Sequence, residues 1–192
     1  LQPLNPYGQS KLFAEKLIKD FTNFNRDFNS VILRYFNPIG SHQSGLIGDN
    51  PKSEATNIMP LLCNSIISDR HFTVHGLDYD THDGSGIRDY IHISDLSEAH
   101  LLAEEKINSK KLSGVHTINL GSGHGHSVLE LIKALEKHSN SKLKIVKGER
   151  RAGDISSSYA NNDLAQKKIG WKPNKSIDEM CLSSLHFYKN FI

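Results

Sequence analysis

The chain has 192 residues, of which 37% are hydrophobic and 23% charged, and its formal net charge is +2. These values are typical of a soluble globular protein that is long enough to bury a sizeable core. Basic and acidic residues are interspersed, so the charge pattern indicates neither a nucleic-acid partner nor a membrane surface. No apolar run approaches the roughly 20 residues of a membrane span.

Helix and strand patterns alternate along the chain. Residues 5–21 predict a helix, and the nearly continuous apolar run at 30–37 is typical of a strand in a parallel sheet. The apolar stripe of the first helix consists of Leu12, Ala14, Leu17, Ile18 and Phe21. The later predicted elements are helix 57–68, strands 71–76 and 87–93, helix 94–107, strand 114–121, helix 127–138, strand 142–148 and helices 162–170 and 176–191. This alternation predicts an α/β fold with a partly parallel sheet.

Capping signals mark several of the predicted helices. A serine followed three residues later by glutamate is a capping box, in which each side chain accepts a hydrogen bond from the other residue's backbone. The expected caps are Ser94 or Asp95 for helix 94–107, Ser127 with Glu130 for helix 127–138, and Ser176 with Glu179 for helix 176–191. Gly170 is expected to end the short helix before it.

The chain has two cysteines, Cys63 and Cys181, and both lie in apolar helical segments. Buried free thiols in a reducing compartment are the favoured interpretation, and a disulfide is the alternative. A cytosolic protein is therefore expected.

Tyr7 and Lys11 are four residues apart at the start of the first predicted helix, so their side chains lie on one face. A phenol is a poor base at neutral pH, but an ammonium group within a few ångströms favours the phenolate. The Tyr-x-x-x-Lys pattern therefore suits proton abstraction from an alcohol whose hydride leaves for a nicotinamide cofactor. A surface tyrosine beside a solvated lysine has the same spacing. The interpretation of this pair as catalytic therefore depends on the rest of the sequence.

That context is a series of distinctive blocks that follow one another along almost the whole chain. They include LNPYGQSKLFAEKL, VILRYFNPIGSHQSGLIGDNP, NIMPLL, FTVHGLDYDTHDGSGIRDYIHISDL, INLGSGHGHSVLELI and RRAGD followed by a tryptophan. In this order they closely resemble the UDP-galactose (UDP-glucose) 4-epimerases of the extended short-chain dehydrogenase/reductase family.

The resemblance implies an α/β fold that combines the C-terminal portion of a Rossmann-type doubly wound domain with a smaller mixed α/β substrate-binding domain. Residues 1–36 would be the tail of the NAD-binding domain and 37–192 mainly the UDP-sugar-binding domain, with about 87–107 returning to the Rossmann sheet. Family members begin with a glycine-rich NAD-binding half and carry a catalytic serine or threonine before the tyrosine. The chain is therefore expected to be a piece of a longer protein and inactive by itself. Family members are commonly homodimers, and the helix bearing Tyr7 and Lys11 is a candidate contributor.

The resemblance also implies site residues. Tyr7 would be the active-site base, Lys11 would hydrogen-bond the nicotinamide ribose and favour the phenolate, and Tyr35 would lie against the nicotinamide end of NAD. The expected UDP-sugar contacts are Asn37 and Asn57 to hydroxyls and phosphate oxygens, Thr73, Val74 and His75 around the uracil, Arg88 and Arg151 on the diphosphate, Asp154 on the uridine ribose, and Ser158 at the sugar pocket.

Structural interpretations stand beside these functional ones. Arg88 and Asp89 can form an ion pair at a strand start, and Asn37 before Pro38 is a normal turn residue. The segment after strand 114–121 imitates a dinucleotide fingerprint, but G-x-G-x-x-G from Gly121 would need glycine where the chain has His126. A structural turn is expected there.

The chain has 11 histidines, and His124 with His126 is the pair that best suggests a metal site. No cluster of carboxylates or thiols accompanies this pair at ligand spacing in the sequence. No metal site is therefore predicted.

The expected function is interconversion of UDP-glucose and UDP-galactose in galactose metabolism, by transient NAD-dependent oxidation at C4. The position matched by Ser158 gates the sugar pocket in this family, and its small side chain predicts that UDP-GlcNAc and UDP-GalNAc are also accepted. A shift of one residue would place Tyr159 there instead. Two alternatives remain open at this stage, another NAD-dependent nucleotide-sugar enzyme such as a dehydratase, and a non-catalytic UDP-sugar-binding fragment.

Overall fold

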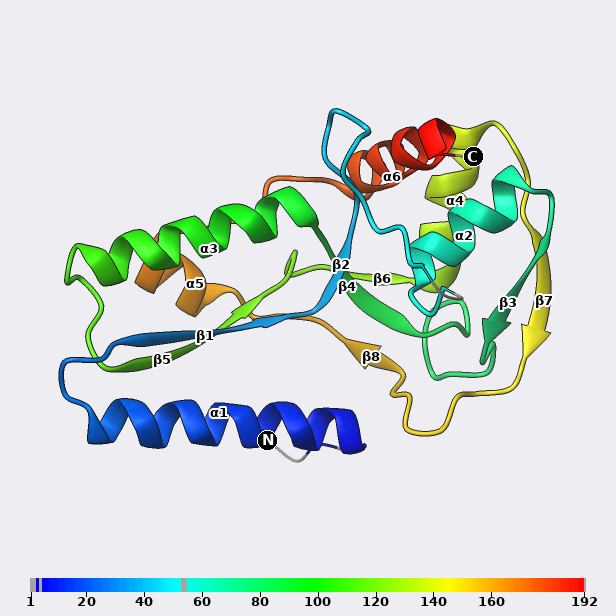
Figure 1. Ribbon diagram of the computed structural model, residues 1–192. Helices are drawn as coiled ribbons and strands as arrows, with labels where there is room; N and C mark the ends of the chain where they lie inside the picture. The colour runs from blue at the N-terminus through cyan, green and yellow to red at the C-terminus, as the bar shows by residue number, and fades with distance from the viewer. Residues whose placement is uncertain (1–2, 4, 53–54, 192) are drawn as a thin grey trace.

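A computed structural model describes residue 3 and residues 5–52 and 55–191 of the chain. Helices and strands alternate along it, as Figure 1 shows. The elements are α1 (Pro6–Phe24), β1 (Ser30–Tyr35), β2 (Asn37–Ile39), α2 (Ile58–Ile67), β3 (His71–His75), β4 (Ile87–His92), α3 (Ile93–Asn108), β5 (Val115–Leu120), β6 (Gly125–Ser127), α4 (Val128–Ser139), β7 (Lys144–Gly148), β8 (Ser157–Ser158), α5 (Asp163–Ile169) and α6 (Ile177–Phe191).

One part of the molecule is built on the parallel pair of β1 and β5. Helix α1 lies on one side of this pair, and α3 and α5 lie on the other (Figure 1). The core between the strands and the latter two helices contains Ile118, Leu120 and the fully buried Trp171, whose indole N–H donates to the carbonyl of Asp95. This helix–sheet–helix layering is the expected Rossmann-type arrangement.

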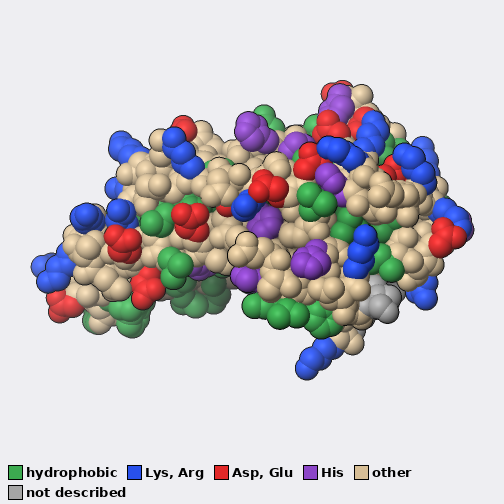
Figure 2. Space-filling view, turned by 90° about the horizontal axis from the view of Figure 1, so that it is seen from above, with side chains coloured by type: hydrophobic (Ala, Val, Ile, Leu, Met, Phe, Trp, Pro, Cys, Tyr) green, Lys and Arg blue, Asp and Glu red, His purple; other side chains and the backbone are tan. Residues whose placement is uncertain are grey.

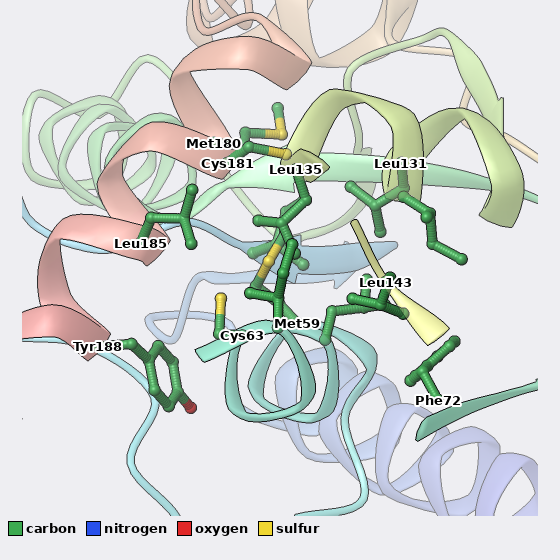
Figure 3. Packing of buried hydrophobic residues seen from close by; sticks show 14 of the residues in the cluster. Met59, Cys63, Phe72, Leu131, Leu135, Leu143, Met180, Cys181, Leu185 and Tyr188 are labelled. Atoms are coloured by element: carbon green, nitrogen blue, oxygen red, sulfur yellow. The ribbon is translucent and has the colours of Figure 1, made fainter. Parts of the chain in front are cut away.

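The other part is built on β4, which pairs with β2 and β8 in parallel and with β6 in antiparallel orientation, and on the parallel pair of β3 and β7. Figure 3 shows its core, in which α2, α4 and α6 bring together the labelled side chains of Met59, Cys63, Leu135, Met180 and Leu185. The close packing of these apolar groups is the main source of stability for this part.

Both cysteines are buried and free, as predicted. Burial raises the pKa of the Cys181 thiol to about 12 and also raises the pKa of Cys63. The two groups are therefore protonated and serve as small apolar side chains of this core.

Helix α1 buries a polar face and exposes an apolar one. Its buried residues are Glu15, which accepts two hydrogen bonds from Arg34 of β1, and Thr22, whose hydroxyl lies 2.9 Å from that of Ser30. The predicted apolar stripe does form, but Leu17 and Phe21 on it are exposed. Nothing in the described part of the chain covers them, because the ion pair turns the opposite face of the helix toward the sheet.

The predicted helices and strands are confirmed, with bounds that differ by at most three residues. The capping boxes of Ser127 with Glu130 and of Ser176 with Glu179 both form. The predicted cap of α3 is wrong, because His92 is the N-cap residue and its ring accepts from the backbone N–H of Ser94. The carboxylate of Asp95 instead accepts hydrogen bonds from the backbone N–H groups of residues 174 and 175.

Two packing regions support the expected division of the chain, although the exact domain bounds remain a prediction. Strand β4 ends in the region around Trp171, and α3 lies wholly within it. Residues 112–120 and 165–171 pack there as well, which favours a wider return to the Rossmann sheet than 87–107.

Basic, acidic and histidine side chains are mixed over the face above α3 and α6 in Figure 2. Neither charge dominates this face. Among the described residues, no helix has the length and apolar character needed to cross a membrane.

Candidate substrate-binding site

Most of the predicted UDP contacts line one cavity of about 240 Å³. They come from elements that are far apart in the sequence: β2, the start of α2, β3, β4 and the loop before β8. The predicted residues that line it are Asn37, Asn57, Thr73, Val74, His75, Arg88, Arg151 and Asp154. Tertiary structure therefore assembles one polar site from residues proposed individually.

Arg88 is fixed at this cavity by its own neighbours. Its Nη1 donates to the carbonyls of Ile87 and Ile155, each at 2.8 Å, and its Nη2 lies 3.6 Å from Asp154 Oδ1. Two carbonyl bonds hold the planar guanidinium in one orientation, so the cation is preorganised for an anionic group. The ion pair with Asp89 that the structural interpretation offered does not form, because Asp89 bonds to backbone N–H groups elsewhere.

Asn37 and Asn57 lie between this cavity and a second one of about 600 Å³, and they line both. Asn37 opens β2 opposite Tyr90 of β4, so it is a strand residue and not the turn residue of the structural interpretation. Asn57 is the N-cap residue of α2, but its amide donates to Asp49 at 3.1 Å and does not cap the helix. The two amides therefore stand where the cavities meet.

Strand β3 provides the wall on the side predicted for the uracil. Val74 is buried, whereas Thr73 is exposed, as the alternation of a strand requires. The ring of His75 is partly buried, and its Nδ1 lies 3.1 Å from the carbonyl oxygen of Glu149. This contact fixes the imidazole against the chain that follows β7.

Two tyrosines in the cavity were missed by sequence reasoning. Tyr79 and Tyr90 are both buried, Tyr90 to 1% exposure, and neither hydroxyl has a hydrogen-bond partner among the described atoms. Burial raises the pKa of Tyr90, so its hydroxyl stays protonated and can donate. A buried polar group without a partner is costly, so the two hydroxyls are available to hydrogen-bond whatever fills the cavity. The alternation along β4 was the available signal, because Tyr90 is two residues beyond Arg88 and therefore shares its face.

The turn that imitates a dinucleotide fingerprint binds an internal carboxylate. Asp89, which is fully buried, accepts from the backbone N–H groups of Ser122, Gly123 and Ala160 and from the Ser122 hydroxyl. Successive N–H groups of this kind form an anion-binding nest. Since Asp89 already occupies it, the turn is structural, as expected.

Tyr7 and Lys11 lie together on α1, with the Lys11 ammonium 5.1 Å from the centroid of the Tyr7 ring. Tyr7 is 72% exposed. Because α1 and β1 run in opposite directions (Figure 1), the start of α1 and the end of β1 lie at the same end of the pair. Tyr35 is at that end, half exposed, with its hydroxyl 3.4 Å from His100 Nε2.

Ser158 does not line the cavity but lies beside it. Strand β8 pairs with β4 so that Ser158 is opposite Arg88, and partners in a parallel pair share a face of the sheet. Ser158 is partly buried, whereas Tyr159 points to the other face and is 62% exposed. The register therefore favours Ser158 over Tyr159 as the residue next to the site.

The fold is that of an α/β protein built on part of a Rossmann-type sheet, with a polar cavity beside it. Residues 1–121 match the model of the NAD dependent epimerase/dehydratase family. The chain belongs to this family.

Relatives and solved structures agree with this assignment. The chain is 44% identical to the UDP-glucose 4-epimerase of Drosophila melanogaster over 178 residues, which are 92% of this chain and 51% of the relative. It is similar to the crystal structure of UDP-glucose 4-epimerase from Bifidobacterium longum in complex with NAD+ and UDP, with a TM-score of 0.92, 42% identity and coverage of 99% of this chain and 56% of that one. The UDP-Glc/GlcNAc 4-epimerase from Campylobacter jejuni matches with a TM-score of 0.76, 32% identity and coverage of 99% and 57%. The chain spans about half the length of the curated relatives it matches.

Proposed function

We propose that the whole protein, to which this chain contributes the part from the Tyr-x-x-x-Lys motif onward, interconverts UDP-glucose and UDP-galactose. The reaction is a transient oxidation at C4 of the sugar that depends on NAD. The observation that carries this proposal is the cavity of about 240 Å³ in which two arginines, two asparagines and two unpartnered tyrosine hydroxyls meet.

In this proposal the cavity holds the UDP portion. Arg88 and Arg151 bind the diphosphate, Asp154 accepts from the ribose hydroxyls, and the backbone of β3 contacts the uracil. The guanidinium of Arg88 is already oriented by carbonyl bonds, so little ordering is lost on binding. A firm grip on UDP is what an epimerase needs, because the sugar must turn while the nucleotide stays in place.

Tyr7 acts as the base that removes the proton from the 4-hydroxyl group, and it later returns a proton there. Lys11 favours the phenolate by its charge, which its position over the Tyr7 ring supports. The sugar is attached through the diphosphate linkage, about which the ketose turns to present its other face. A permissive sugar pocket is required for this turn.

The residues present fit the nicotinamide end of NAD. An exposed phenol, an ammonium group with no ion pair among the described residues, and the half-exposed ring of Tyr35 lie at one end of the α1–β1 pair. NAD supplies the hydride acceptor and donor for C4 when it is bound. The glycine turn at 121–123 does not serve its pyrophosphate, because Asp89 occupies the N–H groups of that turn.

Purified full-length protein tests the proposal. We expect cofactor absorbance to copurify with it and UDP-galactose to be converted to UDP-glucose, with the activity abolished in Tyr7→Phe. Accumulation of a dehydrated keto-sugar would indicate the dehydratase alternative. UDP binding without any turnover of UDP-sugars would indicate the non-catalytic alternative.

Ser158 supports a broader substrate range within this function. Its side chain is small and, by the pairing of β8 with β4, lies on the Arg88 face of the sheet, which supports room for an N-acetyl group. A relative described as a UDP-Glc/GlcNAc 4-epimerase, at 32% identity, adds support. Turnover of UDP-GlcNAc by the full-length protein is the direct measurement.

We also propose a homodimer that pairs through α1 and a cytoplasmic location. Phe13, Leu17, Phe21 and Phe24 recur at helical spacing on the exposed face of α1, and such an apolar face favours a protein partner. The buried free thiols support a reducing compartment. Light scattering of the full-length protein should give twice the subunit mass, and Leu17→Glu should reduce it to that of the monomer.

A further inference from the structure

Lys11 stands between two possible partners on α1. Tyr7 is one helical turn before it and Glu15 is one turn after it, and side chains four apart on a helix are neighbours. The ammonium group lies over the Tyr7 ring, 5.1 Å from its centroid. Among the described residues Lys11 forms no ion pair with the Glu15 carboxylate on its other side, although opposite charges at this spacing often pair.

The reason lies on β1, beside α1 in Figure 1. Arg34 donates from Nε to Glu15 Oε1 at 2.6 Å and from Nη2 to Glu15 Oε2 at 2.5 Å. This fork-to-fork geometry is the strongest form of arginine–carboxylate pairing and uses both oxygens of Glu15. The hydrogen bonds from Arg34 also lower the pKa of Glu15, so the group stays a carboxylate near neutral pH.

Among the described residues, the charges near Glu15 come from two elements. On α1 itself, Lys19 Nζ lies 3.9 Å from Glu15 Oε2. On β1, Arg34 is the partner already described. Strand β5 has one titratable residue, His116, whose Nε2 lies 3.0 Å from the carbonyl oxygen of Ser113. Arg34 is therefore the group that neutralises Glu15 from the sheet.

We propose that Arg34 is a positioning residue that, by occupying the carboxylate of Glu15, keeps the Lys11 ammonium beside Tyr7. The inference rests on the proposed function, since it matters for catalysis only if Tyr7 is the base. Without Arg34, a buried carboxylate would stand one turn from Lys11 and would draw its ammonium away from the phenol. The phenolate would then be less favoured, because its nearest positive charge has moved toward a negative one.

Substitutions at three positions of the full-length protein test this mechanism. In Arg34→Met, the acid limb of the kcat–pH profile should move to higher pH by about 0.5–1 unit, which is about a three- to tenfold loss of kcat on that limb. In the double variant Glu15→Gln with Arg34→Met, the profile should return to that of the parent protein. Adding Lys19→Gln to Arg34→Met should enlarge the shift, because Lys19 competes with Lys11 for the freed carboxylate.

A merely structural role of Arg34 predicts a different pattern. It would lower kcat by the same factor at every pH, and Glu15→Gln would not restore the profile. Either result overturns the inference. Arg26→Met, at an exposed arginine after α1, is the matched control and should leave the profile unchanged.

The ionisation of Tyr7 can also be followed without turnover, by NMR of ring-labelled tyrosine with Tyr7→Phe to assign the signal. A parent protein that lacks epimerase activity would refute the proposed function, and the shift of this titration in Arg34→Met would still decide the inference. If Arg34→Met does not fold, Arg34→Lys decides it, because lysine replaces the fork by a point charge. A smaller shift in the same direction supports the inference, and an unchanged titration overturns it.

Discussion

Ser158 lies directly opposite Arg88 in the parallel pairing of β8 with β4. The two side chains therefore share one face of the sheet, while Tyr159 next to Ser158 points away and is exposed. Sequence comparison alone leaves the choice between Ser158 and Tyr159 open. The pairing register favours Ser158 as the side chain beside the proposed sugar pocket.

Enlarging Ser158 should therefore narrow the substrate range. We expect Ser158→Tyr in the full-length protein to lose at least about tenfold in kcat/KM for UDP-GlcNAc, a change of roughly 1.4 kcal/mol, because the ring would fill the space for the N-acetyl group. Turnover of UDP-galactose should change little. Equal losses for both substrates, measured by competition kinetics, would contradict the gating role.

Removal of the Tyr7 hydroxyl should abolish chemistry and leave binding intact. General base catalysis contributes about 10² to 10⁴ in rate, so Tyr7→Phe should reduce kcat by at least about a hundredfold. Since Tyr7 lies outside the cavity proposed to hold UDP, the dissociation constant for UDP from calorimetry should stay within about twofold. A weakened UDP affinity would instead place Tyr7 among the UDP contacts.

Arg88 should contribute mainly to UDP affinity. Replacing it with methionine keeps most of the apolar stem but removes the charge, and charge-assisted hydrogen bonds are worth about 1.5–3 kcal/mol. UDP should therefore bind about ten- to a hundredfold more weakly, and the remaining affinity should depend less on salt. Arg26→Met is the matched control, because Arg26 is exposed and outside the cavity, and its UDP affinity should equal that of the parent protein.

The unpartnered hydroxyl of Tyr90 gives a prediction in which stability and affinity change in opposite directions. Without ligand, Tyr90→Phe removes a buried polar atom that has no partner among the described residues, so the free energy of unfolding should rise by up to about 1–3 kcal/mol. If UDP supplies the partner, the same variant should bind UDP several-fold more weakly. Thermal unfolding with and without UDP measures both effects, and a loss of stability without ligand would show that the hydroxyl is already satisfied.

His92 should make stability depend on pH. Burial lowers its pKa below the ordinary value of 6.5, so the folded protein keeps the ring neutral while the unfolded chain takes up a proton. The unfolded state then binds more protons, and the free energy of unfolding should fall as pH decreases below about 6.5, by at most about 1.4 kcal/mol per pH unit from this group.

The control for this effect is a second histidine. His92→Gln should flatten the dependence of the melting temperature on pH between about 7.5 and 5.5, whereas His124→Gln at an exposed position should leave the slope of the parent protein. Equal slopes in the parent protein and His92→Gln would contradict the assignment.

Local sequence patterns were sufficient to predict the longer helices and strands. They were not sufficient to predict which face of each element packs against its neighbours. The periodicity of α1 predicted both the helix and its apolar stripe, yet the ion pair between Glu15 and Arg34 turns the polar face to the sheet. This orientation depends on two residues 19 apart in the sequence, which no helical periodicity contains. Strands β2, β6 and β8 were missed because they have only two or three residues each and exist only through pairing with β4.

The same distinction holds for the site. Resemblance to a family supplied individual residues such as Asn37 and Asp154, and the fold gathers them around one cavity. The alternation along β4 could place Tyr90 on the face of Arg88, but it could not show that the Tyr90 hydroxyl lacks a partner, since a tyrosine in a half-apolar segment is most often satisfied within the core. The unpartnered hydroxyls of Tyr79 and Tyr90 become visible only when every neighbouring donor and acceptor has been placed.

The neighbouring residues Arg88 and Asp89 place opposite charges on the two faces of β4. One face presents a cation to the cavity, and the other inserts a carboxylate into the nest formed by Ser122, Gly123 and Ala160. A slip of β4 by a single residue would exchange the two faces, placing a carboxylate at the proposed diphosphate position and a guanidinium against backbone N–H groups. The contact at the cavity and the contact with the backbone N–H groups would then both become repulsive. The alternating charges of Arg88 and Asp89 therefore favour one register of this strand.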